Sequence, residues 1–193
     1  MTRLRARIQT GDFEVGAELA ALRARNPKIG AVACFAGTVR DLNEGETVAA
    51  LELEHYPGMT EKALEAIATE AIARWPGIEV AIIHRVGRLL PLDQIVFVAT
   101  VAAYRGDAFA SCEFVMDYLK TEAPFWKKES TPSGERWVDA RSSDDAALAR
   151  WACAPATGAS RAEGRGKPGG ATRLTRFSST RRRPAGPLPS RLA

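Results

Sequence analysis

Two apolar strand patterns joined by a short link place the strongest constraint on the fold. Residues 78–86 and 94–103 each read as a buried strand, and only residues 87–93 separate them. A link of this length has no room for a helix, so we expect the two strands to pair antiparallel as a hairpin. This connection argues against a doubly wound parallel sheet, in which a helix separates successive strands.

The remaining patterns alternate between strands and helices. Residues 4–9, 30–39 and 48–55 read as strands, and residues 125–130 and 136–140 read as a hairpin around a turn at 131–134. Apolar residues recur at helical spacing over 14–25, 60–75, 107–122 and 143–151, with Asp12 and Asp107 expected as N-caps. Because several strands follow one another directly, the expected fold class is α+β, with a mixed, largely antiparallel sheet and flanking helices.

One helical face leads directly into a cluster of lysines. Phe109, Glu113, Met116 and Lys120 recur at helical spacing, and Lys127 follows in the next strand. A lysine beside aromatic surface or another cation loses its charge more readily than one in water, and it can then act as a nucleophile or base. The same spacing also fits solvated lysines near a helix end, where cations interact favourably with the helix dipole. The pattern alone leaves both interpretations open.

A second candidate site follows the strand at 30–39. Gly37 lets another group approach the backbone closely, and Arg40 stands where the strand ends. An arginine in this place can bind an anionic ligand through its forked donors, or it can be an exposed loop residue. The pattern does not separate these two alternatives.

Charge divides the chain into two parts. Residues 152–193 hold nine Lys and Arg and one acid, whereas residues 1–151 hold 18 bases and 22 acids. The net charge of +4 therefore gives no reason to expect nucleic-acid binding by the first part. We expect one domain over 1–151 and a basic, Gly-, Pro- and Arg-rich disordered tail over 152–193. Arg181, Arg182 and Arg183 can contact RNA or anionic lipid, but a solubilising tail is the favoured interpretation.

Composition restricts where the protein acts. No apolar run approaches the roughly 20 residues of a membrane span, and no apolar segment follows the N-terminal residues as in a signal peptide. Three scattered cysteines fit a reduced, cytoplasmic protein, and we expect Cys34 and Cys112 to be buried, unreactive thiols. His55 and His84 lie in strand patterns without a third ligand nearby, so no metal site is expected.

Six ordered motifs carry a resemblance to a known family. They are FAGTVR at 35–40, LEHYPGM at 53–59, IHRVG at 83–87, MDYLK at 116–120, APFWKKE at 123–129 and RWVDAR at 136–141. Together they resemble the large, catalytic subunit of molybdopterin synthase, over about residues 4–151. The tail lies outside this resemblance.

The resemblance implies an α/β hammerhead-type fold and a sulfurtransferase of molybdenum cofactor biosynthesis. Such a molybdopterin synthase converts cyclic pyranopterin monophosphate into molybdopterin by adding two dithiolene sulfurs. The sulfur arrives on the thiocarboxylated C-terminal Gly-Gly of a small ubiquitin-like carrier subunit, whose tail enters a pocket of the large subunit. The large subunit is expected as a homodimer within a cytoplasmic heterotetramer, without metal or organic cofactor, membrane or nucleic acid. The alternative is a catalytically silent scaffold that binds the carrier.

The resemblance also implies roles for individual residues. Lys120 and Lys127 match the catalytic lysines, and Lys120 is expected either to act as acid and base or to hold the carrier covalently for a time. Both lysines also match substrate-binding positions, as do Thr38, Val39, Arg40, Tyr104, Arg105, Lys128, Glu129 and Arg141, while Phe35 and Met116 match pocket-shaping positions. Arg105 and Arg141 are expected to come from the dimer mate.

Two positions depart from the family pattern. Tyr104 replaces a common histidine, and a tyrosine donates a hydrogen bond but does not titrate near neutral pH. Leu92 replaces a common turn glycine.

Overall fold

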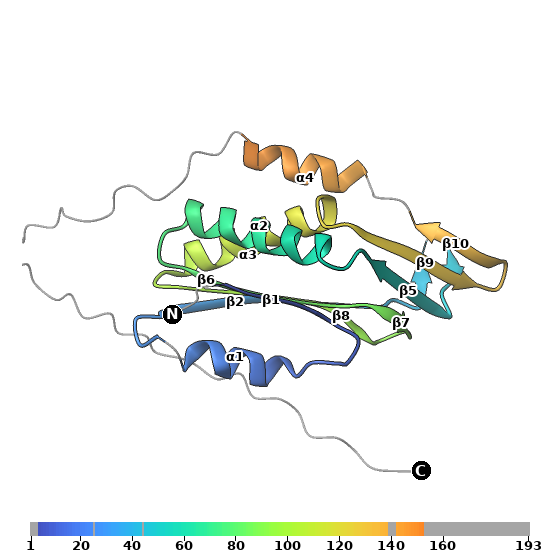
Figure 1. Ribbon diagram of the computed structural model, residues 1–193, viewed down its shortest axis with the longest axis horizontal. Helices are drawn as coiled ribbons and strands as arrows, with labels where there is room; N and C mark the ends of the chain where they lie inside the picture. Colours follow the sequence, from blue (N-terminus) through green and yellow to red (C-terminus); the bar gives the residue numbers. More distant parts are fainter. Residues whose placement is uncertain (1–3, 25, 44, 139–141, 153–193) are drawn as a thin grey trace, which may run out of the picture. The chain divides into compact units, whose positions relative to one another are not determined.

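The first of two four-stranded sheets forms the centre of the structure. The structure, a computed structural model, describes residues 4–24, 26–43, 45–138 and 142–152. The first sheet has the order β1-β6-β8-β2, formed by Leu4–Gln9, Glu79–Arg85, Gln94–Ala102 and Ala31–Thr38. β1 pairs in parallel with β6, whereas β6 with β8 and β8 with β2 pair antiparallel. Figure 1 shows α1 on one side of this sheet and α2 and α3 on the other.

The second sheet lies beside the first and is antiparallel throughout. Its order is β10-β9-β5-β7, formed by Gly134–Val138, Phe125–Thr131, Ala50–His55 and Gly87–Leu89. β7 occupies the link between β6 and β8, so this link closes the expected hairpin and also adds a strand to the second sheet. A short ladder of β3 (Leu42–Asn43) and β4 (Glu46–Thr47) completes the described strands. The predicted α+β fold is confirmed, with its strands divided between sheets.

The helices occupy the predicted segments, but two predicted caps are wrong. They are α1 (Val15–Arg23), α2 (Met59–Arg74), α3 (Arg105–Thr121) and α4 (Ser142–Ala152). Glu14, not Asp12, caps α1 by accepting a hydrogen bond from the Gly16 amide at 3.2 Å. Asp107 lies within the first turn of α3, because the helix starts earlier, after Tyr104. Among the described residues, no helix is both long and apolar enough to cross a membrane.

The central strands β6 and β8 are buried on both faces. Side chains alternate along a strand, so Val80 and Ile82 pack in a cluster with α2 and α3, while Ala81 and Ile83 pack in a cluster with α1. Trp151 of α4 joins the first cluster, with its ring centroid 5.4 Å from that of Phe114. The two clusters hold the sheet in place between its helices.

The two cysteines within the described residues differ in exposure. Cys112 is buried in α3, and burial raises the pKa of its thiol to about 11, which keeps it protonated and unreactive as expected. The expectation for Cys34 is wrong, since its side chain is exposed. The reason is its position on β2, the edge strand of the first sheet.

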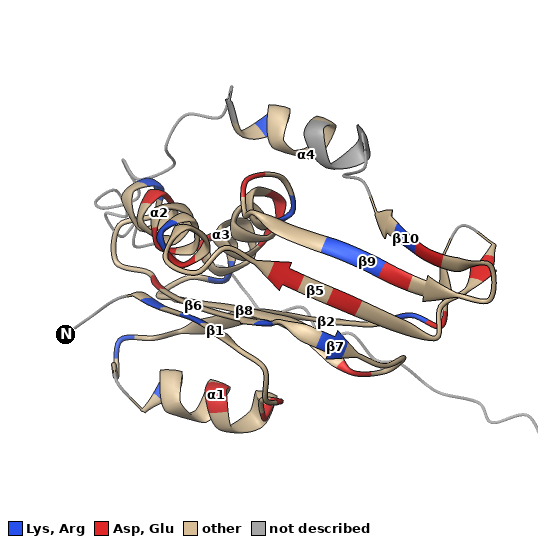
Figure 2. Ribbon diagram, turned by 45° about the vertical axis from the view of Figure 1, so that its right-hand side comes forward, with Lys and Arg blue, Asp and Glu red and all other residues tan. Residues whose placement is uncertain are grey.

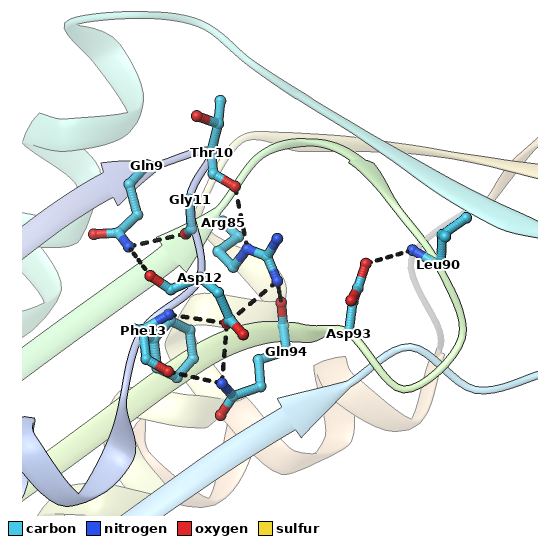
Figure 3. A network of polar contacts seen from close by, with 9 residues as sticks. All are labelled: Gln9, Thr10, Gly11, Asp12, Phe13, Arg85, Leu90, Asp93 and Gln94. Carbon is cyan, nitrogen blue, oxygen red and sulfur yellow. Dashed lines mark hydrogen bonds and ion pairs between the residues drawn. The ribbon is translucent and has the colours of Figure 1, made fainter.

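A buried arginine ties the ends of three segments together (Figure 3). Arg85, at the end of β6, is only 9% exposed. Its Nη1 donates to the Gln94 carbonyl at 2.9 Å and to Asp12 Oδ1 at 3.3 Å, and its Nε donates to the Thr10 carbonyl at 3.3 Å. Gln94 Nε2 donates to the same Asp12 oxygen at 3.0 Å. The loop before α1 is thereby fixed to the ends of β6 and β8, and Asp12 is engaged here rather than as a cap.

We predict that Arg85→Met lowers the free energy of unfolding by about 2–3 kcal/mol, because the buried guanidinium and its hydrogen bonds to Thr10, Asp12 and Gln94 are lost. The matched control is Arg88→Met, on an exposed position of β7, which should change stability by no more than about 0.5 kcal/mol. Urea denaturation of both variants measures the difference. Equal free energies of unfolding for the two variants would show that the Arg85 network does not stabilise the fold.

Candidate functional site

A cavity of about 500 Å³ lies where the end of β2, the end of α3 and the second sheet meet. Its volume suits a small organic ligand. The lining residues with polar or charged side chains are Thr38, Arg40, Asn43, His84, Lys120, Lys127 and Glu129. The apolar wall and backbone come from Phe35, Gly37, Val39, Val48, Leu51, Leu53, Ile95, Val96, Met116, Leu119, Ala123, Phe125 and Val138.

One face of β9 forms a wall of the cavity. Side chains two residues apart in a strand share a face, and Phe125, Lys127 and Glu129 all line the cavity. Across the sheet, Leu53 and Val138 pair with Lys127 in register and lie on the same face. The second sheet therefore presents a lysine within an otherwise largely apolar surface.

Lys128 lies on the opposite face of β9. Its Nζ is 3.1 Å from Glu135 Oε2 and 5.8 Å from the centroid of the Trp137 ring. In register it pairs with Glu52, and Figure 2 shows basic positions of β9 beside acidic positions of β5. The structure does not bring Lys128 into the cavity with Lys127.

The two ends of α3 carry different sets of predicted site residues. Met116 and Lys120, one turn apart, line the cavity at the C-terminal end. Tyr104 and Arg105 lie at the N-terminal end, where both are exposed. A rise of 1.5 Å per residue separates Arg105 from Lys120 by about 22 Å along the helix. Within one chain, therefore, the structure does not place Tyr104 or Arg105 at the cavity.

The pairing of β2 with β8 is irregular where β2 ends at the cavity. The register with β8 shifts between Gly37 and Thr38, which is typical of a β-bulge. A Cβ on Gly37 would lie 3.1 Å from the Phe35 ring and 3.0 Å from Val96, so glycine permits this close packing, as predicted. Val39 is then held by hydrogen bonds of 2.9 Å to the backbone of Leu92 and Asp93. The outcome is that Thr38, Val39 and Arg40 reach the cavity wall.

The turn that holds Val39 departs from ordinary backbone geometry. Leu92 has φ of 75°, the left-handed region that a glycine adopts without strain, and its side chain is 85% exposed. Leu92, which stands where the resembled family commonly has a turn glycine, therefore adopts a backbone conformation that favours glycine.

A buried carboxylate links three segments at the wall of the cavity. Glu129 is 7% exposed, and its Oε1 accepts a hydrogen bond from Asn43 Nδ2 at 2.8 Å. Its Oε2 accepts from Arg136 Nη2 at 3.0 Å. Asn43 Oδ1 in turn lies 3.5 Å from Arg40 Nη2. We call Arg136, Glu129 and Asn43 the Glu129 clamp, which ties the β9–β10 hairpin to the β3 segment and to Arg40.

His84 is the other buried polar group of the cavity. It is 6% exposed and stacks on Phe125, with ring centroids 3.7 Å apart and an interplanar angle of 14°. Its Nδ1 lies 2.8 Å from the Arg85 carbonyl oxygen. Burial lowers the pKa of His84 from 6.5 to about 4, the hydrogen bond to Arg85 opposes this shift, and the charges of Lys127 and His55 add to it. The ring is therefore neutral at neutral pH.

The cavity presents cations to a ligand. Arg40, Lys120 and Lys127 line it, whereas Glu129, the acid among the described lining residues, already bonds to Arg136 and Asn43. Such a lining attracts an anionic group and can bind it through charged donors. In the described part of the chain, no group of three His, Cys, Asp or Glu side chains is arranged to hold a metal ion.

The structure gathers most of the predicted site residues and adds others. Arg141 lies outside the described residues. Asn43 and His84 were not predicted as site residues. His84 stands within the IHRVG motif and was considered only as a metal ligand, whereas Asn43 is 86 residues from Glu129 and gave no local signal.

Known proteins share both the sequence and the fold. A family model described as "MoaE protein" matches residues 8–122. The molybdopterin synthase catalytic subunit of Ralstonia nicotianae is 64% identical over 145 residues, which is 75% of this chain and 82% of the relative. The molybdopterin biosynthesis MoaE protein from Burkholderia ambifaria superposes with a TM-score of 0.69 at 78% identity, covering 80% of this chain and all of that one.

A more distant structure matches in fold alone. It is a protein–protein complex of subunits 1 and 2 of molybdopterin-converting factor from Helicobacter pylori. The matched chain is 20% identical, with a TM-score of 0.60, and the match covers 73% of this chain and 93% of that one.

We predict that Glu129→Gln lowers the free energy of unfolding by about 2 kcal/mol, because Arg136 loses its buried counter-charge. The control is Glu135→Gln, whose carboxylate is 63% exposed in its pair with Lys128 and should contribute no more than about 0.5 kcal/mol. Urea denaturation at neutral pH measures both. A loss for Glu129→Gln no larger than that for Glu135→Gln would contradict the structural role of the clamp.

We also predict that His84 makes stability fall as the pH falls from about 6.5 to about 4. In this window His84 is protonated in the unfolded chain but still neutral in the folded chain. Acid therefore lowers the free energy of unfolding by up to about 3 kcal/mol. The free energy of unfolding of the natural chain should therefore fall more steeply with acid than that of His84→Gln. Parallel pH profiles for the two proteins would show that His84 titrates normally in the folded state.

Proposed function

The chain belongs to the MoaE protein family of molybdopterin synthase catalytic subunits, and we propose that the cavity lined by Lys120 and Lys127 is where its reaction takes place. The predictions of the family and of an enzyme of molybdenum cofactor biosynthesis are confirmed by the similarity to the Ralstonia and Burkholderia proteins. The observation that carries the proposal for the site is the convergence of Arg40, Lys120 and Lys127 on one cavity from three separate motifs.

The proposed substrate is cyclic pyranopterin monophosphate. Its phosphate is an anion, for which Arg40 offers a forked donor and the lysines offer charge. The cavity volume of about 500 Å³ suits a pterin of this size. Phe35 and Met116 supply apolar surface beside it.

The proposed sulfur donor is the thiocarboxylated C-terminus of a small ubiquitin-like carrier. A Gly-Gly end has no side chains, so it can enter a narrow cavity, and its terminal thiocarboxylate is an anion that cations attract. In each transfer a carbon–sulfur bond on the pterin side chain replaces a carbon–oxygen bond, whose oxygen leaves as water or stays on the phosphate when the cyclic phosphate opens. The acyl–sulfur bond of the carrier breaks, and water adds its oxygen to the acyl carbon. Lys120 then either moves a proton or holds the carrier end covalently for a time, and Lys127 binds the reacting anions. A complex of the two kinds of subunit is the subject of the Helicobacter structure.

We further propose that two copies of the chain assemble with two carriers in the cytoplasm. Arg105 lies about 22 Å from Lys120 along α3, and Tyr104 precedes it, so a role at the cavity requires that both come from a second copy. The edge strand β2, with Cys34 and Phe35 exposed, offers unpaired backbone groups near the cavity for such an assembly. Arg141 is proposed as a further contribution from the second copy. Lys128 is left out of the proposed substrate contacts, since its side chain lies on the other face of β9.

We predict that Lys120→Ala lowers the rate of molybdopterin formation at least ~100-fold, because proton transfer or covalent capture at the carrier end is lost. The assay combines the purified full chain, thiocarboxylated carrier and cyclic pyranopterin monophosphate, and it measures the dithiolene product. Lys62→Ala, at an exposed position of α2, is the matched control and should retain the natural rate.

Two outcomes would contradict this assignment. A Lys120→Ala variant with the natural rate would remove Lys120 from the mechanism. A natural chain that binds the carrier but neither binds nor converts the pterin, in a direct titration, would favour the catalytically silent scaffold.

A further inference from the structure

His84 occupies a fixed position in the cavity wall that the reaction described above does not use. It lies near the end of β6, where Val80 and Ile82 precede it on the same face. The Phe125 ring stacks on it at 3.7 Å, so the imidazole cannot turn out of the wall without losing this contact. A polar ring held this firmly presents its outer nitrogen in one direction.

The hydrogen bond to Arg85 determines which nitrogen carries the proton. A carbonyl oxygen can only accept, so the 2.8 Å contact requires the hydrogen on Nδ1. The neutral ring then has a lone pair on Nε2. Among the described residues, no fully buried side-chain nitrogen or oxygen lacks a hydrogen-bond partner, and the bond of His84 runs through Nδ1. Nε2 is therefore accessible from the cavity, as an uncharged acceptor.

The backbone that fixes this tautomer is itself anchored from the far side of the sheet. Successive side chains alternate, so Arg85 points away from the cavity, into the network of Figure 3. There its guanidinium donates to Thr10, Asp12 and Gln94. The amide of Val86 also bonds to the Gln9 carbonyl at 3.0 Å. The Arg85 peptide is thus held on both sides, and the His84 ring with it.

The charged and titratable groups around His84 come from four elements. Lys127 lies on the same face of β9 as the stacked Phe125, and its charge acts on the imidazole. His55 of β5 pairs in register with Phe125 and has Glu61 of α2 at 3.7 Å. Lys120 of α3 lines the same cavity. A neutral acceptor in this setting can orient an ammonium group without cancelling its charge, which a carboxylate would do.

We propose that His84 is a positioning residue for the transfer reaction, whose Nε2 accepts a hydrogen bond from the Lys127 ammonium group and orients it toward the bound anion. This role depends on the proposed function of Lys127. A lysine has four rotatable side-chain bonds, so an anchored acceptor that selects one arrangement lowers the entropy lost when the anion binds. The positive charge of Lys127 remains directed at the ligand, since the acceptor is uncharged.

Three substitutions separate positioning from packing. His84→Asn keeps a donor where Nδ1 stood, His84→Gln keeps a polar atom where Nε2 stood, and His84→Phe keeps only the ring stack on Phe125. We expect His84→Asn and His84→Phe to lower kcat about 10-fold with KM for the carrier little changed, and His84→Gln to recover part of the rate. A folded His84→Phe with the natural kcat would overturn the proposal, and so would equal losses in His84→Gln and His84→Asn.

A spectroscopic test keeps the inference separate from the proposed function, because it needs no activity. In the ¹⁵N-labelled full chain at neutral pH, His84 should carry its hydrogen on Nδ1, with Nε2 unprotonated. Lys127→Met should shift the Nε2 resonance and raise the pKa of His84, while Lys128→Met, on the opposite face of the same strand, should do neither. A hydrogen on Nε2, or an Nε2 resonance that is unchanged in Lys127→Met, would overturn the proposal even if the chain forms molybdopterin in the assay.

Discussion

The pairing of β6 with β8 is the constraint on which the site depends. Both strands are buried on both faces, so every residue along them must be apolar or fully bonded. Two polar residues end β6, and strand alternation sends them to opposite faces. Arg85 is satisfied on the α1 side by backbone carbonyls and Asp12, and His84 is satisfied on the cavity side by the Arg85 carbonyl. The same short link that forces the hairpin supplies β7 to the second sheet, and so brings the cavity's other wall against the first sheet.

Charge around the cavity combines the cations Arg40, Lys120 and Lys127 with a buried carboxylate, Glu129, that is bonded to other residues. A buried carboxylate beside Arg40, Lys120 and Lys127 would ordinarily neutralise one of them, but Glu129 has both oxygens bonded to Arg136 and Asn43. His84 adds an acceptor without adding charge, since burial keeps its ring neutral. Glu129 is therefore held within the Glu129 clamp.

The sequence predicted most elements within a few residues, because helical and alternating periodicities directly reflect which faces are buried. It predicted Met116 and Lys120 on one helical face, and a close approach at Gly37, for the same local reason. It could not predict the Glu129 clamp, which joins residues 86 positions apart through a register that local patterns do not contain. The sequence analysis matched both Lys127 and Lys128 to substrate-binding positions, whereas adjacent residues of a strand point to opposite faces and the pairing with β5 and β10 decides which face lines the cavity. Exposure of Cys34 likewise follows from the strand order, which places β2 at an edge.

The separation of the two ends of α3 bears on why such a chain would act as more than one copy. Arg105 and Tyr104 stand at the helix N-terminus, where the dipole and the unsatisfied amides favour an anion, whereas Lys120 stands at the other end, in the cavity. A two-fold arrangement in which each copy offers its helix start to the cavity of the other would place both cationic groups around one anion. Each copy would then supply residues to both sites, and formation of the dimer would also complete each substrate-binding site. In such an arrangement Tyr104 contributes a hydroxyl group that can donate a hydrogen bond to the anion, while Lys120 and Lys127 act from within the cavity.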